Sequence, residues 1–192
     1  YKIKHLGIAR RSAKGIELRV HPTLIPDEEL IANVNGVKNA VLVQANAVGP
    51  TLYYGAGAGA GPTASAVVAD VVDIVRDIIY TEDGAGTIPQ LAFEALSDLP
   101  ILSSDEMTTG YYLRINAEDQ TGVLADVTTI LSRLGIGIDA IMQQPRLKDL
   151  IPIVILTDPI QESKMNEAIA KIQALSFVHG EAVRIRLELL DN

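Results

Sequence analysis

The sequence of 192 residues contains no cysteine and no tryptophan. Without cysteine the chain can form neither a disulfide nor a thiolate metal site. It also lacks long hydrophobic runs: apolar stretches such as residues 64–69 end at Asp70 or at glycines, far short of the roughly 20 residues that a membrane span needs. No secretory leader is present and the first residue is Tyr1. We therefore expect a cytoplasmic protein without a membrane segment, and a piece of a longer chain.

Positive charge is also scarce. The formal net charge of −8 argues against general nucleic-acid binding, because phosphate binding needs a basic surface. Six of the 16 basic residues nevertheless fall within the first nineteen positions: Lys2, Lys4, Arg10, Arg11, Lys14 and Arg19. They could form a phosphate-facing strip, but a solvated or subunit-facing hairpin surface is the favoured interpretation. His5, His21 and His179 have no second ligand at metal spacing, so we expect no metal site.

Hydrophobic patterning in the first half predicts an antiparallel or mixed sheet with helices. Ile16, Leu18 and Val20 alternate with polar residues, which predicts a hairpin around residues 12–15 with one buried face. A short helix is expected over 26–34, a strand pair over 39–46 and 51–55, and a long helix over 62–80 that packs on a sheet. A further helical segment is possible at 91–96.

The second half follows a different order. Strands are predicted at 111–118, 136–143, 150–157 and 183–189, and amphipathic helices at 122–134 and 161–175. In chain order this is βαββαβ, the ferredoxin-like arrangement, with one four-stranded sheet and both helices on one face. The fold class is therefore α+β. Residues 97–110 are rich in Ser, Pro, Thr and Gly and are predicted to link the two halves.

The segment YYGAGAGAGPTASAVVAD, residues 53–70, raises the question of nucleotide binding. A Walker loop is excluded because Gly61 is followed by Pro62 rather than lysine. The pattern G-x-G-x-x-G/A is met, but the helix that follows leads to Glu82 and Asp83 instead of a second buried strand. A complete nucleotide domain is therefore absent. The loop could still bring backbone amides close to a ligand, or its small residues could simply let helix and strand pack.

Two segments resemble known families. With KIKHLGIARR and NAVLVQ upstream, residues 53–70 resemble the carboxyl-terminal half of the catalytic domain of bacterial homoserine dehydrogenases, whose loop reads YG-x-GAG-x-x-PTASAV followed by aspartate. YYLRINAEDQTGVLADVTTILSRLGIGIDAIMQQ resembles an ACT domain, an amino-acid-sensing βαββαβ module. The resemblance implies a dimerising catalytic-domain part at 1–96, a linker at 97–110 and an ACT domain at 111–192.

The first resemblance implies part of an enzyme that interconverts L-aspartate 4-semialdehyde and L-homoserine with NAD(P). In that family the Rossmann domain and the proton-handling lysine lie upstream of the segment that KIKHLG matches, so this chain would hold no catalytic residue and bind no cofactor alone. Backbone contacts lining the cofactor site are expected from Gly57, Ala58 and Gly59, and contacts at the substrate cleft from Gly61, Pro62 and Thr63. Ala56 and Gly61 replace the arginine and methionine that the family often has.

The second resemblance implies an amino-acid effector, and pathway logic points to threonine. The expected effector-binding residues are Asp119, Gln120, Thr121, Gly122, Val123 and Leu124, with Gln143 contributed by a partner module. Helix amides at this loop can bind a carboxylate, and Asp119 either holds the ammonium group or caps the helix, the favoured interpretation. The intact protein is expected to form at least a dimer through the catalytic sheet and the ACT domains.

Two other interpretations remain open at this point. The chain could be a free-standing amino-acid-binding regulator without catalysis, or a structural oligomerisation piece with an empty pocket. The sequence does not distinguish NAD from NADP, because the residue that selects between them would lie outside the chain.

Overall fold

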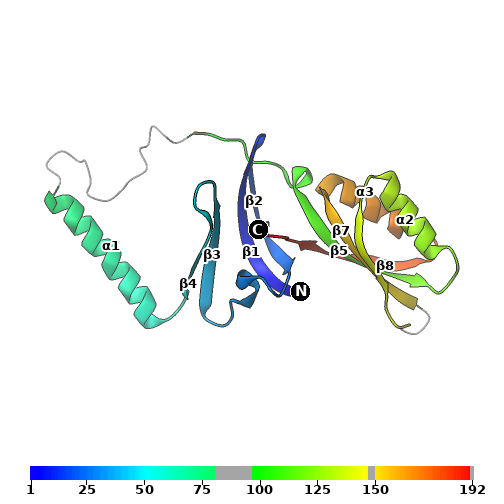
Figure 1. Ribbon diagram of the computed structural model, residues 1–192, viewed down its shortest axis with the longest axis horizontal. Coiled ribbons are helices and arrows are strands. Elements are labelled where there is room, and N and C mark those ends of the chain that lie inside the picture. Colours follow the sequence, from blue (N-terminus) through cyan, green and yellow to red (C-terminus); the bar gives the residue numbers. More distant parts are fainter. Residues whose placement is uncertain (81–96, 147–149, 191–192) are drawn as a thin grey trace. The chain divides into compact units, whose positions relative to one another are not determined.

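The computed structural model describes residues 1–80, 97–146 and 150–190 (Figure 1). The described residues fall into two compact units, one within 1–32 and 99–190 and the other within 33–80 and 97–98, and each is treated by itself. The possible helix at 91–96 lies outside the described residues.

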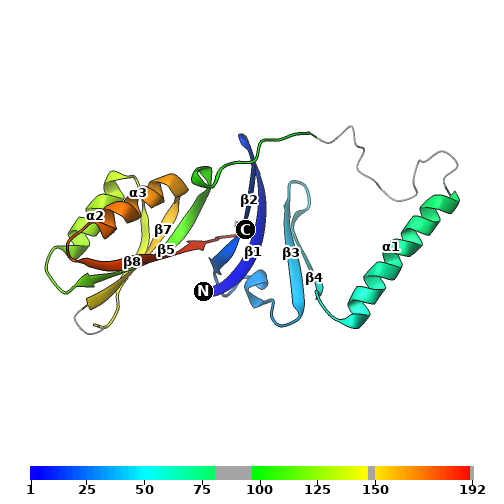
Figure 2. The same ribbon diagram turned by 180° about the vertical axis from the view of Figure 1, so that it is seen from behind.

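The first unit contains the predicted βαββαβ fold. Its elements are β5 (Thr108–Glu118), α2 (Val123–Arg133), β6 (Ile138–Gln143), β7 (Leu150–Gln161), α3 (Glu162–Gln173) and β8 (Val178–Leu187). The strands lie in the order β8-β5-β7-β6 with antiparallel neighbours. Both helices cover the same face of this sheet (Figures 1 and 2). The α+β class and the ferredoxin-like order are thereby confirmed.

Side-chain alternation along β5 explains why the helices pack on one face. Leu113, Ile115 and Ala117 are buried and belong to one hydrophobic cluster with residues of both helices, including Val127 and Met165. Complete burial of each large aliphatic side chain contributes about 1.5–3 kcal/mol. The intervening residues of β5 point to the opposite face of the sheet.

The amino-terminal hairpin extends this sheet. β1 (Lys2–Ser12) and β2 (Gly15–Ile25) pair antiparallel, as predicted, and β2 continues the sheet beside β8 to give six strands in the order β1-β2-β8-β5-β7-β6. The β2–β8 pairing is parallel and brings Thr23 opposite Arg186 and Leu24 opposite Leu187. The four-stranded sheet predicted from the sequence is therefore part of a larger one.

The hairpin does not bury the face that the sequence suggested. Leu18 and Val20 are 47% and 70% exposed, whereas Glu17, Arg19 and His21 on the other face are buried. The reason is a carboxylate distant in sequence: Glu188 accepts hydrogen bonds from both Arg19 and Arg10. Two members of the basic amino-terminal cluster are thus paired internally and are not part of a phosphate-facing strip.

Two short segments near the units' edges differ from the expected pattern. The helix predicted over 26–34 is reduced to the 3-10 helix η1 (Leu30–Asn33). The preceding residues form a turn in which Glu29 N–H donates to the Pro26 carbonyl, an i to i+3 bond that does not continue as an α-helix. The predicted linker contains the 3-10 helix η3 (Ser104–Glu106) and the first residues of β5.

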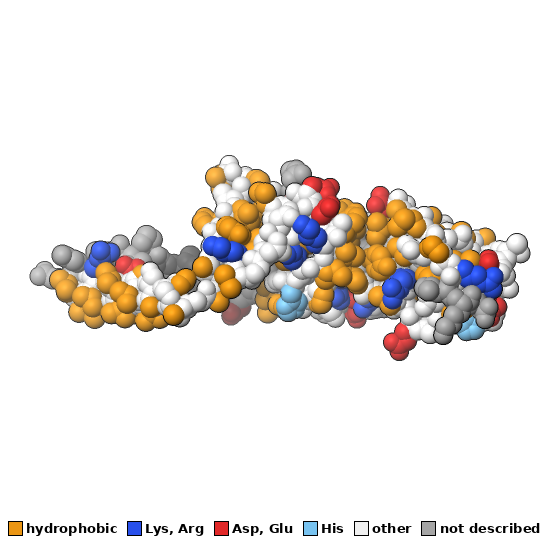
Figure 3. Space-filling model, turned by 90° about the horizontal axis from the view of Figure 1, so that it is seen from below, with side chains coloured by type: hydrophobic (Ala, Val, Ile, Leu, Met, Phe, Trp, Pro, Cys, Tyr) orange, Lys and Arg blue, Asp and Glu red, His pale blue; other side chains and the backbone are white. Residues whose placement is uncertain are grey.

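The second unit holds a two-stranded antiparallel sheet and the long helix. β3 (Lys38–Ala45) and β4 (Gly49–Ala56) pair along their full length, and α1 (Ala60–Tyr80) follows the glycine loop. The expected strand pair and helix are confirmed. Within this unit the expected packing of the helix on a sheet is not found, because the apolar side chains of α1 are exposed, and Figure 3 shows apolar groups along this helix. The exposed residues are Val67, Val68, Val71, Val72, Ile74, Val75, Ile78 and Ile79.

Within the described residues, no helix is both long and apolar enough to cross a bilayer. The acidic residues of α1, such as Asp70, Asp73 and Asp77, interrupt its apolar residues every few positions.

Candidate functional site

The glycine loop connects β4 to α1. Gly57 N–H donates to the Val37 carbonyl at 2.8 Å, and a Cβ at Gly57 would lie 2.0 Å from Nδ2 of Asn39. Gly59 adopts φ +128°, in the region that favours glycine, and its carbonyl accepts the N–H of Thr63 at 3.1 Å. Both glycines therefore have local structural roles.

The rest of the loop is more open. Residues 57–63 are all exposed, and a Cβ on Gly61 would meet no atom within 4 Å. The Gly57 amide is already bonded within the chain, and Thr63 N–H is used in the first turn of α1. The exposed backbone around Ala58 and Gly61 leaves room for a ligand to approach. Pro62 has no N–H to offer.

The loop between β5 and α2 carries the expected effector site. The N-cap of α2 is Gly122, at φ 96°, and no side chain caps the helix. The interpretation of Asp119 as the helix cap is therefore wrong. Asp119 instead lies 3.7 Å from the guanidinium of Arg146, with both side chains about half exposed. Gln120 N–H donates to the Glu118 carbonyl at 3.0 Å, which tightens the turn.

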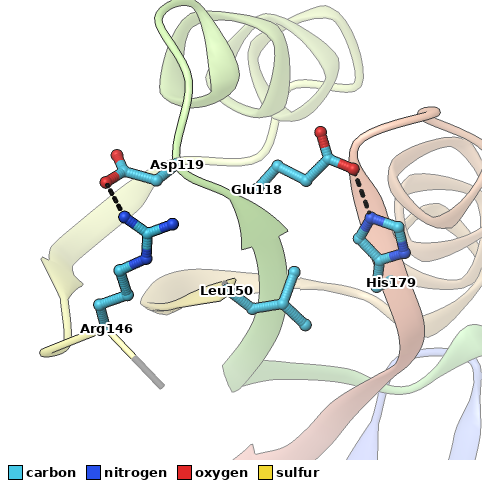
Figure 4. Close-up of a pocket in the computed structure, with 5 residues that line it drawn as sticks. All are labelled: Glu118, Asp119, Arg146, Leu150 and His179. Carbon is cyan, nitrogen blue, oxygen red and sulfur yellow. Dashed lines mark hydrogen bonds and ion pairs between the residues drawn. The ribbon is translucent and has the colours of Figure 1, made fainter. Parts of the chain in front are cut away.

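A cavity of about 550 Å³ opens beside this loop and is lined by Glu118, Asp119, Arg146, Leu150 and His179 (Figure 4). Two polar pairs flank it. One is the ion pair of Asp119 with Arg146, and the other is the hydrogen-bond contact of Glu118 Oε1 with His179 Nε2 at 2.8 Å. The close-up shows Leu150 between the two pairs. The cavity thus combines both signs of charge with an aliphatic side chain.

Strand order explains how residues distant in sequence meet here. Glu118 ends β5 directly opposite Leu150, the first residue of β7, and Asn116 lies opposite His179 near the start of β8. Because Ala117 faces the helices, Glu118 lies on the uncovered face of the sheet. The carboxyl end of β5 and the amino ends of its two antiparallel neighbours therefore share one edge of the fold.

The residues predicted for the effector site do not all lie beside the cavity. Asp119 lines the cavity, whereas Val123 is a buried core residue and Leu124 packs against the same core. Gln120, Thr121 and Gly122 are exposed in the loop. Gln143 lies on β6 opposite Ile153 and is not among the cavity's lining residues.

Sequence reasoning missed four lining residues: Glu118, Arg146, Leu150 and His179. The spacing of the histidines bears on metal binding alone and does not point to His179 as a lining residue. The predicted βαββαβ order already contained the signal, since it places the end of the first strand beside the starts of the third and fourth strands.

A second group of charges lies where α3 begins. The Glu162 carboxylate, 3% exposed, accepts hydrogen bonds from the Tyr111 hydroxyl at 2.6 Å and from Arg186 at 2.6 and 2.9 Å. Burial opposes ionisation of Glu162, but the bonds from Arg186 and Tyr111 hold its pKa below the usual range. Burial and the bond to Glu162 raise the pKa of Tyr111. Tyr111, Glu162 and Arg186 find their hydrogen-bond partners within this cluster, so we assign it a structural role.

Among residues 1–80, 97–146 and 150–190, no three His, Asp or Glu side chains come close enough together to hold a metal ion.

The fold and the loop at the end of β5 define the carboxyl-terminal half as an ACT-type domain, and residues 111–174 match the ACT domain family model. Residues 1–72 match the model described as homoserine dehydrogenase. The chain therefore joins a segment that matches the homoserine dehydrogenase family to an ACT domain.

Individual relatives match over nearly the whole chain. Homoserine dehydrogenases of Pseudomonas aeruginosa and Neisseria gonorrhoeae are 56% and 49% identical and match 100% and 99% of the chain, which spans 44% of each relative. The crystal structure of a homoserine dehydrogenase from Thiobacillus denitrificans is 56% identical, with a TM-score of 0.88 over 98% of this chain and 42% of that one. The chain therefore spans less than half the length of the relatives it matches.

Proposed function

We propose that this chain is part of an NAD(P)-dependent homoserine dehydrogenase that interconverts L-aspartate 4-semialdehyde and L-homoserine in the cytoplasm. The observation that carries the proposal is the order of two family segments in one chain, a homoserine dehydrogenase segment at 1–72 and an ACT domain at 111–174. The domain boundaries 1–96, 97–110 and 111–192 belong to the same proposal. When bound, the nicotinamide cofactor supplies the hydride.

The glycine loop fits an edge contact with this cofactor rather than a complete binding site. The exposed backbone of Ala58, Gly59 and Gly61 allows close approach, whereas the Gly57 amide is already bonded to Val37. A full dinucleotide fold needs a second parallel strand after the helix. We therefore assign to these residues the lining of one wall of the cleft, and to this chain alone no turnover.

The ACT domain is proposed to bind an amino-acid effector, with threonine expected from its place at the end of the pathway. Asp119 lies in a cavity that contains charges of both signs. An effector regulates only through a difference in affinity between two states of the enzyme. Threonine binding is expected to favour the less active state.

Association into at least a dimer is part of this proposal. The chain exposes apolar side chains on α1 and on the hairpin, and Tyr53 and Tyr54 on β4 are 65% and 58% exposed. Exposed apolar groups of this extent are typical of surfaces that are covered in an assembly.

Steady-state kinetics test the function. The intact protein should oxidise NADPH or NADH with aspartate semialdehyde, and threonine should lower the rate. The 192-residue chain alone should give no turnover with either cofactor. Activity of the chain alone would contradict the assignment of the active site.

A free-standing regulator without catalysis is the second candidate, because the ACT domain has a complete core of its own. An intact protein that binds threonine but shows no dehydrogenase activity under any cofactor condition would favour it.

A further inference from the structure

We propose that Asn35 is a site of spontaneous deamidation, at which its side-chain amide cyclises with the backbone nitrogen of Gly36 and then opens to aspartate or isoaspartate. The two residues lie in the exposed turn between η1 and β3. The nucleophile, the electrophile and the leaving group all belong to adjacent residues, so the reaction needs only water. It is independent of the dehydrogenase reaction and of effector binding.

The residue that follows Asn35 distinguishes it from the other asparagines. Asn35 is the one asparagine of the sequence that glycine follows. A side chain shields the backbone nitrogen of its own residue, whereas glycine leaves that nitrogen open to attack. Asn33 is also exposed, but it precedes the β-branched Val34. The sequence therefore favours the reaction at Asn35 and provides an internal comparison two positions away.

The structure holds Asn35 and Gly36 in a β-turn that leaves the reacting groups exposed. The Asn35 carbonyl accepts the N–H of Lys38 at 3.3 Å, and Asn35 Nδ2 donates to the Asn33 carbonyl at 3.0 Å. Gly36 adopts φ +65°, and a Cβ there would meet no atom of the described residues within 4 Å. Because the Nδ2 bond joins residues of the same segment, the amide can turn toward the Gly36 nitrogen without disturbing the sheet.

The reaction balances without an oxidant or a cofactor. The Gly36 nitrogen loses its proton to solvent and attacks Cγ of Asn35. A bond from this nitrogen to Cγ forms, the Cγ–Nδ2 bond breaks, and Nδ2 takes up a proton and leaves as ammonia. Water then opens the resulting succinimide ring. Cleavage of the bond to Cγ gives aspartate, and cleavage of the bond to the main-chain carbonyl carbon gives isoaspartate.

Isoaspartate at this position should loosen the glycine loop. Its backbone runs through the side chain of residue 35 and gains an extra carbon atom shortly before Val37, whose carbonyl holds Gly57 N–H at 2.8 Å. Lys38 then pairs with Ala56 at the end of β4. A longer backbone before this pairing should shift the Val37 carbonyl, and the Gly57 amide should lose protection against hydrogen exchange. Aspartate keeps the backbone length and should preserve that protection.

Peptide mass spectrometry of the 192-residue chain during incubation in alkaline buffer tests the proposal. Residue 35 should gain the mass that accompanies replacement of –NH2 by –OH at least about tenfold faster than residue 33, which corresponds to about 1.4 kcal/mol in the activation barrier. The conversion should be slower in mildly acidic buffer, because the attacking nitrogen must lose its proton. An isoaspartate-specific carboxyl methyltransferase, supplied with S-adenosylmethionine, should label the incubated chain at residue 35.

Variants separate the chemistry from changes in the turn. Gly36→Ala should slow the conversion at least about tenfold, because alanine shields the nitrogen and its Cβ has room. Alanine is strained at φ +65°, so Asn35→Gln provides a second test. It retains Gly36 but has to close a larger ring, and it should convert as slowly. Asn33→Gln, the matched control, should leave the rate at Asn35 unchanged.

Three results would contradict the proposal. Conversion at Asn33 as fast as at Asn35, or conversion at Asn35 that Gly36→Ala leaves unchanged, would exclude the assigned chemistry. An unconverted Asn35, under conditions that convert a free peptide with the sequence of residues 33–38, would show that the turn prevents the attack. Unchanged hydrogen exchange at Gly57 in the isoaspartate form, with Asn35→Asp as the reference for charge, would exclude the effect on the glycine loop.

Discussion

Arg19 on β2 and Glu188, the residue after β8, form an ion pair of 2.6 Å in which the two side chains are 2% and 5% exposed. The same carboxylate accepts a hydrogen bond from Arg10 on β1. Arg19 Nε also lies 2.8 Å from Glu17, but without hydrogen-bond alignment. Glu188 is therefore the main counter-charge for two arginines of the hairpin.

Glu188→Gln should lower the free energy of unfolding by about 3 kcal/mol, because it leaves the buried Arg19 without its full counter-charge. Urea unfolding followed by circular dichroism measures this change. Glu167→Gln, which breaks an exposed pair on α3, should cost less than about 1 kcal/mol. Equal effects of the two substitutions would contradict the role assigned to Glu188.

Stability should fall in acid because of Glu162. Its folded-state pKa is below the ordinary value of 4.5, so the unfolded chain binds the proton first as the pH falls. The contribution is complete above pH 4.5 and is lost as the pH drops through the lower folded pKa. Glu162→Gln should remove this part of the pH dependence and cost about 2–3 kcal/mol near neutrality. Unfolding curves at a series of acidic pH values show whether the slope disappears.

Gly135→Ala should destabilise the ACT domain by about 1 kcal/mol. Gly135 follows helix α2 at φ +71°, and Ile136 N–H donates to the Leu131 carbonyl at 3.0 Å, the pattern of a Schellman motif. A side chain at this φ is strained, although asparagine tolerates it better than alanine. Gly135→Asn should therefore lose less stability than Gly135→Ala, and thermal melting compares them. The opposite order would exclude backbone strain as the cause.

The chain by itself should self-associate through α1. Val71 and Ile78 are 53% and 73% exposed, and burial of such side chains is worth about 1.5–3 kcal/mol each. Sedimentation over a wide concentration range should detect dimers or larger species, and Val71→Asp with Ile78→Asp should weaken the association at least about tenfold. Arg76→Gln, an exposed position on the same helix, is the control. Association that is unchanged by the paired substitution would place the contact elsewhere.

Local hydrophobic patterns in the sequence were sufficient to predict most of the helices and strands. The alternation at Leu113, Ile115 and Ala117 predicted both the strand and its buried face, because the partner helices lie next in the sequence and carry matching apolar faces. The hairpin around Ser12 was predicted as well. Its buried face was not, because the burial of Arg19 depends on Glu188, 169 positions away.

The candidate site shows the same limit. The loop that contains Asp119 could be located from the sequence, but Arg146, which pairs with Asp119, could not. Helix capping follows from neighbouring residues, whereas Arg146 reaches Asp119 only after β6 has folded beside β7. Glu118 and His179 meet for an equivalent reason, 61 positions apart. Site residues that are brought together by the order of strands in the sheet can be predicted only once the topology is known.

The parallel pairing of β2 with β8 means that the ACT domain cannot be exchanged independently of the amino-terminal hairpin. Thr23 and Leu24 belong to the segment that matches homoserine dehydrogenase, and their strand neighbours Arg186 and Leu187 lie beyond the ACT match. Exchanging the ACT domain for another by grafting would remove the carboxylate that neutralises Arg10 and Arg19. A transplanted domain would have to supply an acid at the position of Glu188 to avoid this loss of stability.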